Sequence, residues 1–457
     1  MRRGALIPFL LACLIGAGWL NQGMRRSLAE ARAAELDPQH HPLNLGRYLL
    51  YLTYMRSDDE ERYQAVASAL RGLPYDHRRL NDRGTGTAAA IEAGPPEDGH
   101  WHRPYTEVPV EYPIAMLPLV LLPSFVGGTS FEIYARTFGL LMTALLLAGA
   151  ALAIRAQPGR DRREQWTAMA CLLLAEGSLA VQRLDAVLAL LLALAFWAAA
   201  ERRPWTLGTA LGLATAAKFL PLLLVAPLVA ADWEAWASAR ARTRALVGFA
   251  TAAALGFLPM LFPPSALLDV LHYHGARGLQ VESTWAVLIA AGKLLSGTAV
   301  PAEWSFGSWN LPGPLASFCA QLSMPVTLLL MALITVFLAR VPKPADDLAR
   351  RDRLALALLL GLAALWLSAK VFSPQYLTWG LPLVLGVSGS RGRRLTWLFF
   401  AVLVATQVIL CGLYVFVFAV SWVGEIALLV RLALLIALVV ALVRDVATPH
   451  PSISAFN

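Results

Sequence analysis

The chain has 457 residues, of which 58% are hydrophobic and only 15% are charged. That balance excludes a soluble multi-domain protein and predicts a polytopic membrane protein. The formal net charge is +8, but the arginines cluster in short loops between apolar segments, as in cytoplasmic loops, which disfavours a nucleic-acid partner. The four cysteines lie inside apolar segments without paired spacing, so neither a disulfide framework nor a zinc site is indicated.

The N-terminal stretch MRRGALIPFLLACLIGAGWLNQG has a charged start and an apolar centre. Because it lacks a small-x-small cleavage site with a globular protein following, we predict an uncleaved first transmembrane helix with its N-terminus in the cytoplasm. Residues 25–109 are the one long polar stretch. They would form the first extracytoplasmic loop.

Apolar segments follow this loop, and several are shorter than the roughly 20 residues that a spanning helix needs. They run over 110–127, 131–155, 165–181, 186–200, 205–231, 245–263, 284–297, 313–340, 353–369, 375–388, 394–420 and 422–443. Short segments suggest re-entrant pieces around a cavity. We therefore expect one all-α membrane domain over 1–457, with a bundle of about 11 to 13 transmembrane helices. Apart from the first helix, the transmembrane helices and short re-entrant segments would lie within 110–443.

Arginine-rich loops predict which ends of these segments face the cytoplasm. They are Arg155–Arg163, Glu201–Arg203, Arg240–Arg244, Arg340–Arg353, Arg391–Arg394 and Arg444. The intervening stretches, including Arg183–Asp185, Pro263–Ser283 and Lys370–Tyr376, would face outward. Lys218 would also face outward if the segment 205–231 consists of two short arms that meet near this residue. One conflict arises. If the segments 110–127 and 131–155 both crossed the membrane after an outer loop, Arg155–Arg163 would lie outside. Either 110–127 is therefore not a full crossing, or this arginine-rich loop departs from the positive-inside rule.

Three basic residues, Arg183, Lys218 and Lys370, would thus share the outer face, where the positive-inside bias depletes such residues. Each is compatible with snorkelling at the lipid headgroups. Together they suit a phosphate or another anionic headgroup, which lysine binds as a point charge and arginine as a bidentate donor.

The outer loop supplies acids in the stretch YMRSDDEERYQAVASALRGLPYDHRRL. Its alanines and leucines predict a helix, which Ser57 and Glu60 would begin with a capping box. Asp58 and Asp59 would then complement the helix dipole. Alternatively, one of them acts as a base toward an acceptor hydroxyl, which loses its proton as it attacks.

Five stretches in this order carry a family resemblance. They are DDEERYQAVASALRGLPY (58–75), EYPIAMLPLVLLP (111–123), QRLDAVLALLLALAFWAAAERRPWTLGTALGLATAAKFLPLLL (182–224), RGLQVES (277–283) and KVFSPQYLTWGLPL (370–383). The chain resembles the GT-C superfamily of integral-membrane glycosyltransferases, in the branch of bacterial mannosyltransferases that extend phosphatidylinositol mannosides. The resemblance implies a GT-C bundle in the bacterial inner (plasma) membrane, with short helices in its long first outer loop.

The resemblance also implies an inverting transfer of a sugar, with mannose foremost, from a polyprenyl-phosphate donor to a glycolipid or glycan acceptor on the extracytoplasmic side. Either Asp58 or Asp59 fits the family spacing to Tyr63, and Asp58 is the first choice for the base. No nucleotide, metal or other cofactor is required. The expected donor-phosphate partners are Lys370 and Arg277, then Arg183 and Lys218. The expected substrate contacts are Tyr63, Tyr112, Gln280, Glu282, Gln375 and Tyr376, although Glu282 could instead pair with Arg277.

The histidines allow more than one interpretation. His100 and His102 in GHWHRPY are two residues apart and would lie on the same side of an extended strand, which is compatible with metal binding. A metal site needs further ligands, however. We therefore expect these histidines to line the acceptor cleft or to be solvated. His274 lies near Arg277 and is either a donor-phosphate neighbour or a solvated residue.

Other functions stay open on the sequence. A secondary transporter also has broken helices, but usually shows internal repeats, which this sequence lacks. A flippase for the lipid-linked sugar would need the cations without the acid. A third alternative keeps the GT-C plan but changes the acceptor to a protein or to a lipid of the lipid A type.

Overall fold

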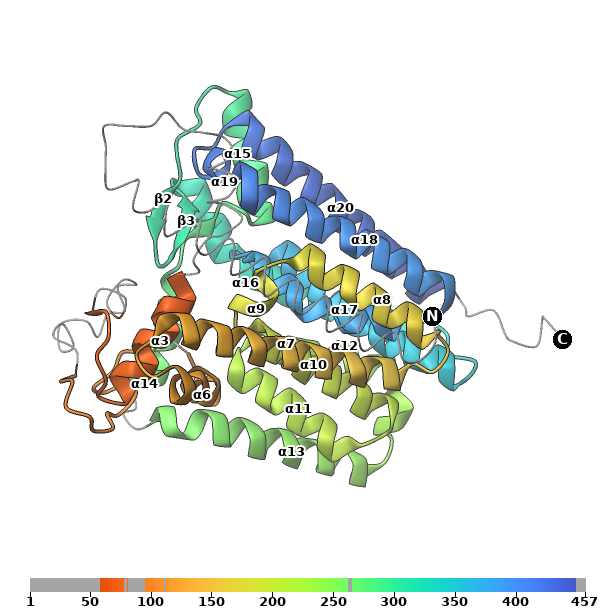
Figure 1. Ribbon diagram of the computed structural model, residues 1–457. Helices are drawn as coiled ribbons and strands as arrows, with labels where there is room; N and C mark the ends of the chain where they lie inside the picture. The colour runs from red at the N-terminus through yellow and green to blue at the C-terminus, as the bar shows by residue number, and fades with distance from the viewer. Residues whose placement is uncertain (1–57, 78–79, 81–94, 111, 262–264, 449–457) are drawn as a thin grey trace.

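The computed structural model describes residues 58–77, 80, 95–110, 112–261 and 265–448. The predicted first transmembrane helix, the capping residue Ser57 and much of the predicted outer loop lie outside these residues. Figure 1 shows long helices running side by side, with short helices and a small sheet gathered at one end.

The elements follow one another in chain order. They are α3 (Asp58–Leu70), η2 (Ile114–Met116), α6 (Leu117–Gly127), α7 (Phe131–Ala156), α8 (Arg162–Glu176), α9 (Leu179–Gln182), α10 (Asp185–Ala200), α11 (Pro204–Ala217), η3 (Leu220–Leu224), α12 (Val225–Ala231), η4 (Trp233–Trp236), α13 (Ala239–Phe257), η5 (Leu258–Leu261), α14 (Ser265–Ala276), β1 (Leu279–Gln280), α15 (Thr284–Leu295), β2 (Glu303–Ser305), β3 (Ser308–Leu311), α16 (Pro314–Arg340), α17 (Asp347–Ser368), η6 (Pro374–Gly380), η7 (Leu383–Gly386), α18 (Gly389–Val408), η8 (Ile409–Leu413), α19 (Tyr414–Phe418) and α20 (Trp422–Ala447).

Three of the described helices, α7, α16 and α20, are long and apolar enough to cross a bilayer. At about 1.5 Å per residue, each exceeds the roughly 30 Å hydrocarbon thickness. The nearly all-helical composition confirms the predicted class, a polytopic membrane protein.

Several of the predicted apolar segments are broken in the structure. The segment 205–231 divides at Lys218, which adopts an extended conformation after α11, before η3 and α12 continue the chain. The segment 165–181 divides at Gly177, whose φ of +61° ends α8. The segment 375–388 consists of the two short 3₁₀ helices η6 and η7.

The structure also resolves the conflict over the charged loop after α7. Helix α6 has 11 residues, so it rises only about 16 Å and cannot cross the bilayer. It packs beside the start of α7, where the Tyr134 hydroxyl donates a hydrogen bond of 2.9 Å to the Val120 carbonyl oxygen. The segment 110–127 is therefore not a full crossing, and α7 can begin at the same end of the bundle as α6.

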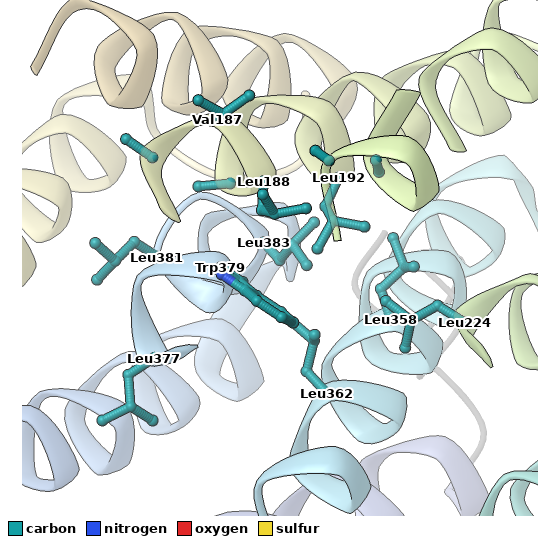
Figure 2. Close-up of a cluster of buried hydrophobic side chains, with 14 of the residues drawn as sticks. Val187, Leu188, Leu192, Leu224, Leu358, Leu362, Leu377, Trp379, Leu381 and Leu383 are labelled. Carbon is teal, nitrogen blue, oxygen red and sulfur yellow. The ribbon is translucent and has the colours of Figure 1, made fainter. Parts of the chain in front are cut away.

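Helix α17 forms the centre of the core. From Leu354 to Trp366 every residue is buried. Its leucines meet those of α10 and η7, and the indole of Trp379 from η6 fills the space between them (Figure 2). The elements that carry the predicted outer residues are thus joined to one apolar core.

A small antiparallel sheet, in the order β1-β3-β2, was not predicted from the sequence. Phe306 and Gly307 both have positive φ, +49° and +68°, and form the tight turn between β2 and β3. The Asn310 side-chain amide donates a hydrogen bond of 2.9 Å to the Ser305 carbonyl oxygen and so fixes the hairpin.

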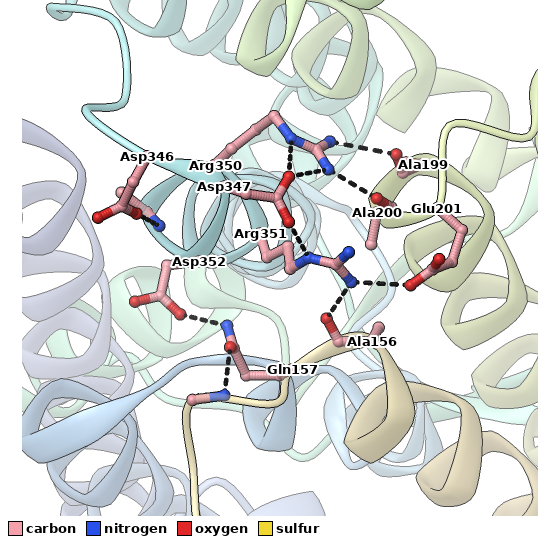
Figure 3. A network of polar contacts seen from close by, with 12 residues as sticks. Ala156, Gln157, Ala199, Ala200, Glu201, Asp346, Asp347, Arg350, Arg351 and Asp352 are labelled. Atoms are coloured by element: carbon pink, nitrogen blue, oxygen red, sulfur yellow. Dashed lines mark hydrogen bonds and ion pairs between the residues drawn. The ribbon is translucent and has the colours of Figure 1, made fainter.

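The arginine-rich loops meet at the end of the bundle opposite this sheet (Figures 1 and 3). Arg351, near the start of α17, donates hydrogen bonds of 2.9 Å to the carbonyl oxygen of Ala156, the last residue of α7, and to Glu201, just after α10. Arg350 donates one of 2.6 Å to the Ala200 carbonyl oxygen. Arg394 of α18 pairs with Asp445 of α20. Loops far apart in the sequence are therefore tied together at this end, which we call the arginine-rich end.

Candidate active site

The predicted acid lies on α3, which packs beside α6 and the start of α7. The side chain of Asp58 lies outside the described part of the structure. Asp59 is buried, and its carboxylate forms an ion pair with the guanidinium of Arg183, at the corner between α9 and α10. The structure therefore brings together one predicted acid and one predicted phosphate partner from positions 124 residues apart (183 − 59).

Tyr63 and Tyr112 lie in the aromatic packing beneath α3. The Tyr63 ring is buried and contacts the Tyr112 ring edge-on, with centroids 5.5 Å apart, and the Phe138 ring at 5.3 Å. The Tyr112 carbonyl oxygen accepts a hydrogen bond of 2.7 Å from Tyr105. These contacts position α3 on the bundle, and a direct substrate contact by either tyrosine stays a prediction.

Asp185 begins α10 and organises a second group of predicted residues. One of its carboxylate oxygens accepts hydrogen bonds from the Lys218 ammonium, at 2.7 Å, and from the Trp379 indole, at 2.6 Å. The Lys218 ammonium also lies 4.5 Å from the ring centroid of Tyr376 and 5.2 Å from that of Trp379. Lys218 and Tyr376 are thus neighbours, as a shared site requires, and Asp185 is a member that sequence analysis did not select.

Lys370 lies in the loop between α17 and η6, outside the membrane-spanning helices. Its ammonium donates hydrogen bonds to the carbonyl oxygens of Gly275, at 2.7 Å, and Arg277, at 2.8 Å, near the C-terminal end of α14. Two of its three N–H donors are therefore used. Burial, and secondarily the nearby charge of Arg277, lower the pKa of Lys370.

Arg277 and Gln280 adjoin Lys370. The Gln280 backbone N–H donates a hydrogen bond of 3.0 Å to the Lys370 carbonyl oxygen, which joins β1 to the loop after α17. Gln280 is 5% exposed. Among the described residues, neither its side-chain oxygen nor the buried Nε of Arg277 has a hydrogen-bond partner. Such orphaned polar atoms are costly unless a ligand or water binds them.

Glu282 does not pair with Arg277, the alternative left open by the sequence. Its carboxylate instead accepts a hydrogen bond of 2.6 Å from Arg431 of α20, which also donates one of 3.0 Å to the Glu282 carbonyl oxygen. The Arg431 guanidinium lies 4.7 Å from the ring centroid of Phe372. The hydroxyl of Tyr414 lies beside Glu282 and within electrostatic range of Arg183. Arg431 therefore joins α20 to the stretch that follows β1.

Sequence analysis missed Arg431 although a signal was present. The residue lies within the apolar run EIALLVRLALLIALVVALV of α20, and a charged side chain inside a spanning helix is costly unless it is paired. The same signal marks Glu176, which ends α8, is fully buried and accepts a hydrogen bond of 2.6 Å from Thr378.

The remaining predicted residues lie near the same end of the bundle. The side-chain oxygen of Gln375 accepts a hydrogen bond from Ser373. His102 contacts the Pro96 carbonyl oxygen at 3.0 Å and Asp98 at 3.2 Å, whereas His100 is exposed. His274 is exposed near the end of α14. Among the described residues, no group of three His, Cys, Asp or Glu side chains is placed to hold a metal ion.

These observations define the class of the protein. It is a helical membrane protein with a cluster of buried polar residues at the end opposite its arginine-rich loops. Residues 111–374 match the model of glycosyltransferase family 87. Since the match covers more than half of the chain, the protein belongs to that family and is a glycosyltransferase. No curated protein and no solved structure matches the chain. The matched stretch includes Arg183, Lys218 and Lys370 but not α3.

Proposed function

We propose that the protein transfers a sugar, with mannose foremost, from a polyprenyl-phosphate donor to a hydroxyl of a glycolipid or glycan acceptor. The observation that carries this proposal is the gathering of basic residues and an α3 acid at the end opposite the arginine-rich loops. If these loops are cytoplasmic, the reaction takes place on the extracytoplasmic face of the bacterial inner membrane.

The reaction is a single displacement at the anomeric carbon. The acceptor oxygen forms a bond to that carbon while the bond to the phosphate oxygen breaks, and its electron pair leaves with the polyprenyl phosphate. A carboxylate takes the proton of the acceptor hydroxyl as it attacks. Attack from the face opposite the leaving group inverts the configuration.

Cationic side chains stabilise the charge that develops on the leaving phosphate. We assign this role first to Lys370 and Arg277, since the ammonium retains one N–H donor and the Nε of Arg277 lacks a partner among the described residues. The orphaned oxygen of Gln280 is available to accept a hydrogen bond from a sugar hydroxyl. Arg183 and Lys218 are already engaged by carboxylates and form the second rank.

The two aspartates receive different roles. The ion pair with Arg183 engages the Asp59 carboxylate, and proton abstraction by Asp59 would compete with this pairing, which argues against Asp59 as the base. We therefore assign proton abstraction to Asp58 and assign Asp59 to holding the Arg183 guanidinium at the corner before α10.

Separate Asp58→Asn and Asp59→Asn variants test this assignment in liposomes containing a polyprenyl-phosphate sugar and an extracted acceptor glycolipid. We expect Asp58→Asn to reduce kcat by about 10²- to 10⁴-fold, the usual contribution of general base catalysis. Asp59→Asn should act mainly on the donor KM and on thermal stability. Glu132→Gln, which changes an exposed acid of the α7 first turn paired with Arg136, is the matched control.

Three results would contradict the proposal. Full activity of Asp58→Asn would remove Asp58 from the chemistry, and full activity of both variants would remove the α3 acids altogether. Absence of transfer by the unmodified protein from any polyprenyl-phosphate sugar, together with transfer from a nucleotide sugar, would exclude the proposed donor class.

A further inference from the structure

A pocket separate from the candidate active site lies between α15 and the start of α16. It has a volume of about 390 Å³ and is mainly apolar, within the range of about 300–1,000 Å³ typical of small-molecule sites. Its lining residues are Trp285, Leu288, Ile289, Gly292, Lys293, Ser296, Leu315 and Cys319.

The pocket has a polar end and an apolar end. The Lys293 ammonium donates a hydrogen bond of 3.1 Å to the Pro312 carbonyl oxygen, just before α16 begins. Leu315 and Cys319 lie progressively further along α16, toward the membrane interior. Since α16 is long and apolar enough to cross a membrane, a membrane around it would have the cation near its surface and the apolar walls deeper.

We propose that this pocket binds an anionic phospholipid of the surrounding bilayer, with one acyl chain between α15 and α16 and the phosphate at Lys293. Only one of the three ammonium donors is used by Pro312, so donors remain for a phosphate. At the same rim, the Ser296 hydroxyl donates a hydrogen bond of 3.1 Å to the Lys293 carbonyl oxygen and lies 2.7 Å from the Thr298 hydroxyl. An acyl chain suits the apolar walls, and the negative headgroup complements the ammonium.

The placement of the cation separates this lipid from the donor substrate. The Trp285 indole, at the other end of the pocket, donates a hydrogen bond of 2.8 Å to the Ser368 carbonyl oxygen, two residues before Lys370. Trp285 and Lys293 are eight residues apart on α15, a rise of about 12 Å. A donor with its phosphate at Lys370 would present its headgroup at the Trp285 end, whereas the pocket cation lies at the opposite end.

The test fills the pocket from Gly292. Gly292 lines the pocket, and a Cβ at this position meets no atom within 4 Å, so Gly292→Phe is designed to add a ring at the pocket wall without a clash at its Cβ. Gly275→Phe is the matched control, because Gly275 is a helical glycine with equally open surroundings on α14. Native mass spectrometry of each protein, released from nanodiscs of phosphatidylglycerol and phosphatidylcholine, measures the retained phospholipid.

We expect the unmodified protein and Gly275→Phe to retain phosphatidylglycerol in preference to phosphatidylcholine, and Gly292→Phe to lose it. Lys293→Ala should weaken retention of phosphatidylglycerol by about five- to tenfold without changing that of phosphatidylcholine. Equal retention by Gly292→Phe and Gly275→Phe would overturn the proposal. So would copurification of a polyprenyl phosphate that Gly292→Phe removes.

Cys319 provides a second measurement that does not depend on the Gly292 variant. Because its side chain lines the pocket, a bound chain should slow its reaction with a small maleimide, as measured by peptide mapping. Phosphatidylglycerol should protect Cys319 in the unmodified protein but not in Lys293→Ala. Identical labelling rates with phosphatidylglycerol and with detergent alone would contradict an occupied pocket.

Discussion

The Lys370 ammonium binds the carbonyl oxygens of Gly275 and Arg277, so it joins the end of α14 to the loop after α17. Carbonyl groups at a helix C-terminus lack intrahelical partners, and a cation there also complements the helix dipole. Burial and the charge of Arg277 nevertheless lower the pKa of this ammonium. The residue therefore combines a structural role with a proton that it loses more readily than an ordinary lysine.

This lowered pKa predicts opposite effects of alkaline pH on activity and stability. Donor binding requires the charged ammonium, so the donor KM should rise at a pH below the usual lysine range, and Lys370→Arg should move that rise to higher pH. Between the folded and unfolded pKa values the unfolded chain binds more protons, so the contribution of Lys370 to stability increases with pH. Donor-dependent initial rates and thermal unfolding, both measured across the alkaline range, check the two signs. An unshifted alkaline limb in Lys370→Arg would contradict the assignment.

At the residue scale, the sequence was enough to select candidate side chains but not to identify the partners that they have in the structure. Arg183, Lys218 and Lys370 were identified because basic residues are unexpected away from the cytoplasmic loops. Their partners, Asp59, Asp185 and the end of α14, are set by helix packing over long sequence distances. Arg431 shows the same limit, since the apolar context could mark it as paired but could not identify Glu282 as the partner.

At the scale of elements, the contact between α11 and α13 depends on glycines. Gly208 and Gly212 form a GxxxG pattern on α11 and face α13, as in closely packed membrane helices. A Cβ at Gly208 would lie 1.9 Å from the Ala245 carbonyl oxygen, and one at Gly212 would lie 2.5 Å from that of Phe249. Both distances are far below van der Waals contact, so α11 and α13 would have to separate.

Gly208→Ala should therefore destabilise the protein, by roughly 1–3 kcal/mol if overpacking of a core is the guide. Gly292→Ala is the control, because its Cβ meets open space and alanine favours a helix by about 1 kcal/mol over glycine. Thermal unfolding in one detergent, followed by intrinsic fluorescence, compares the two variants. An equal or higher midpoint for Gly208→Ala would mean that this helix contact adapts without cost.

The elements themselves were predictable to different degrees. Hydrophobic runs predicted an apolar segment over 205–231 and left open that it consists of two short arms, and the structure divides it into α11, η3 and α12. The three-stranded sheet escaped prediction because β1 has only two residues and β2 only three. Such short strands have no periodicity to detect, and their pairing depends on the turn at Phe306 and Gly307 and on the Asn310 side chain.

At the scale of the whole molecule, the two ends of the bundle have different compositions and should face different compartments. Glu234 and Glu303 are exposed residues, the first beside Lys343 at the arginine-rich end and the second on the small sheet. A cysteine replacing Glu303 should react with a membrane-impermeant maleimide in intact cells. A cysteine replacing Glu234 should react only after permeabilisation, and the reverse pattern would place the candidate active site in the cytoplasm.

The hydrogen bonds of Arg350 and Arg351 have a mechanical consequence. They tie the ends of α7, α10 and α17 to one another, so these helices resist sliding or separating there. If α10 tilted away from its neighbours, the tilt would therefore be centred on this tied end. The length of α10 from Ala200, at the tied end, to Asp185 is about 22 Å at about 1.5 Å per residue. A tilt of about 5° over that length would move the Asp185 end by about 2 Å. Such a shift is enough to change the contacts around Asp185 while the tied end keeps its hydrogen bonds.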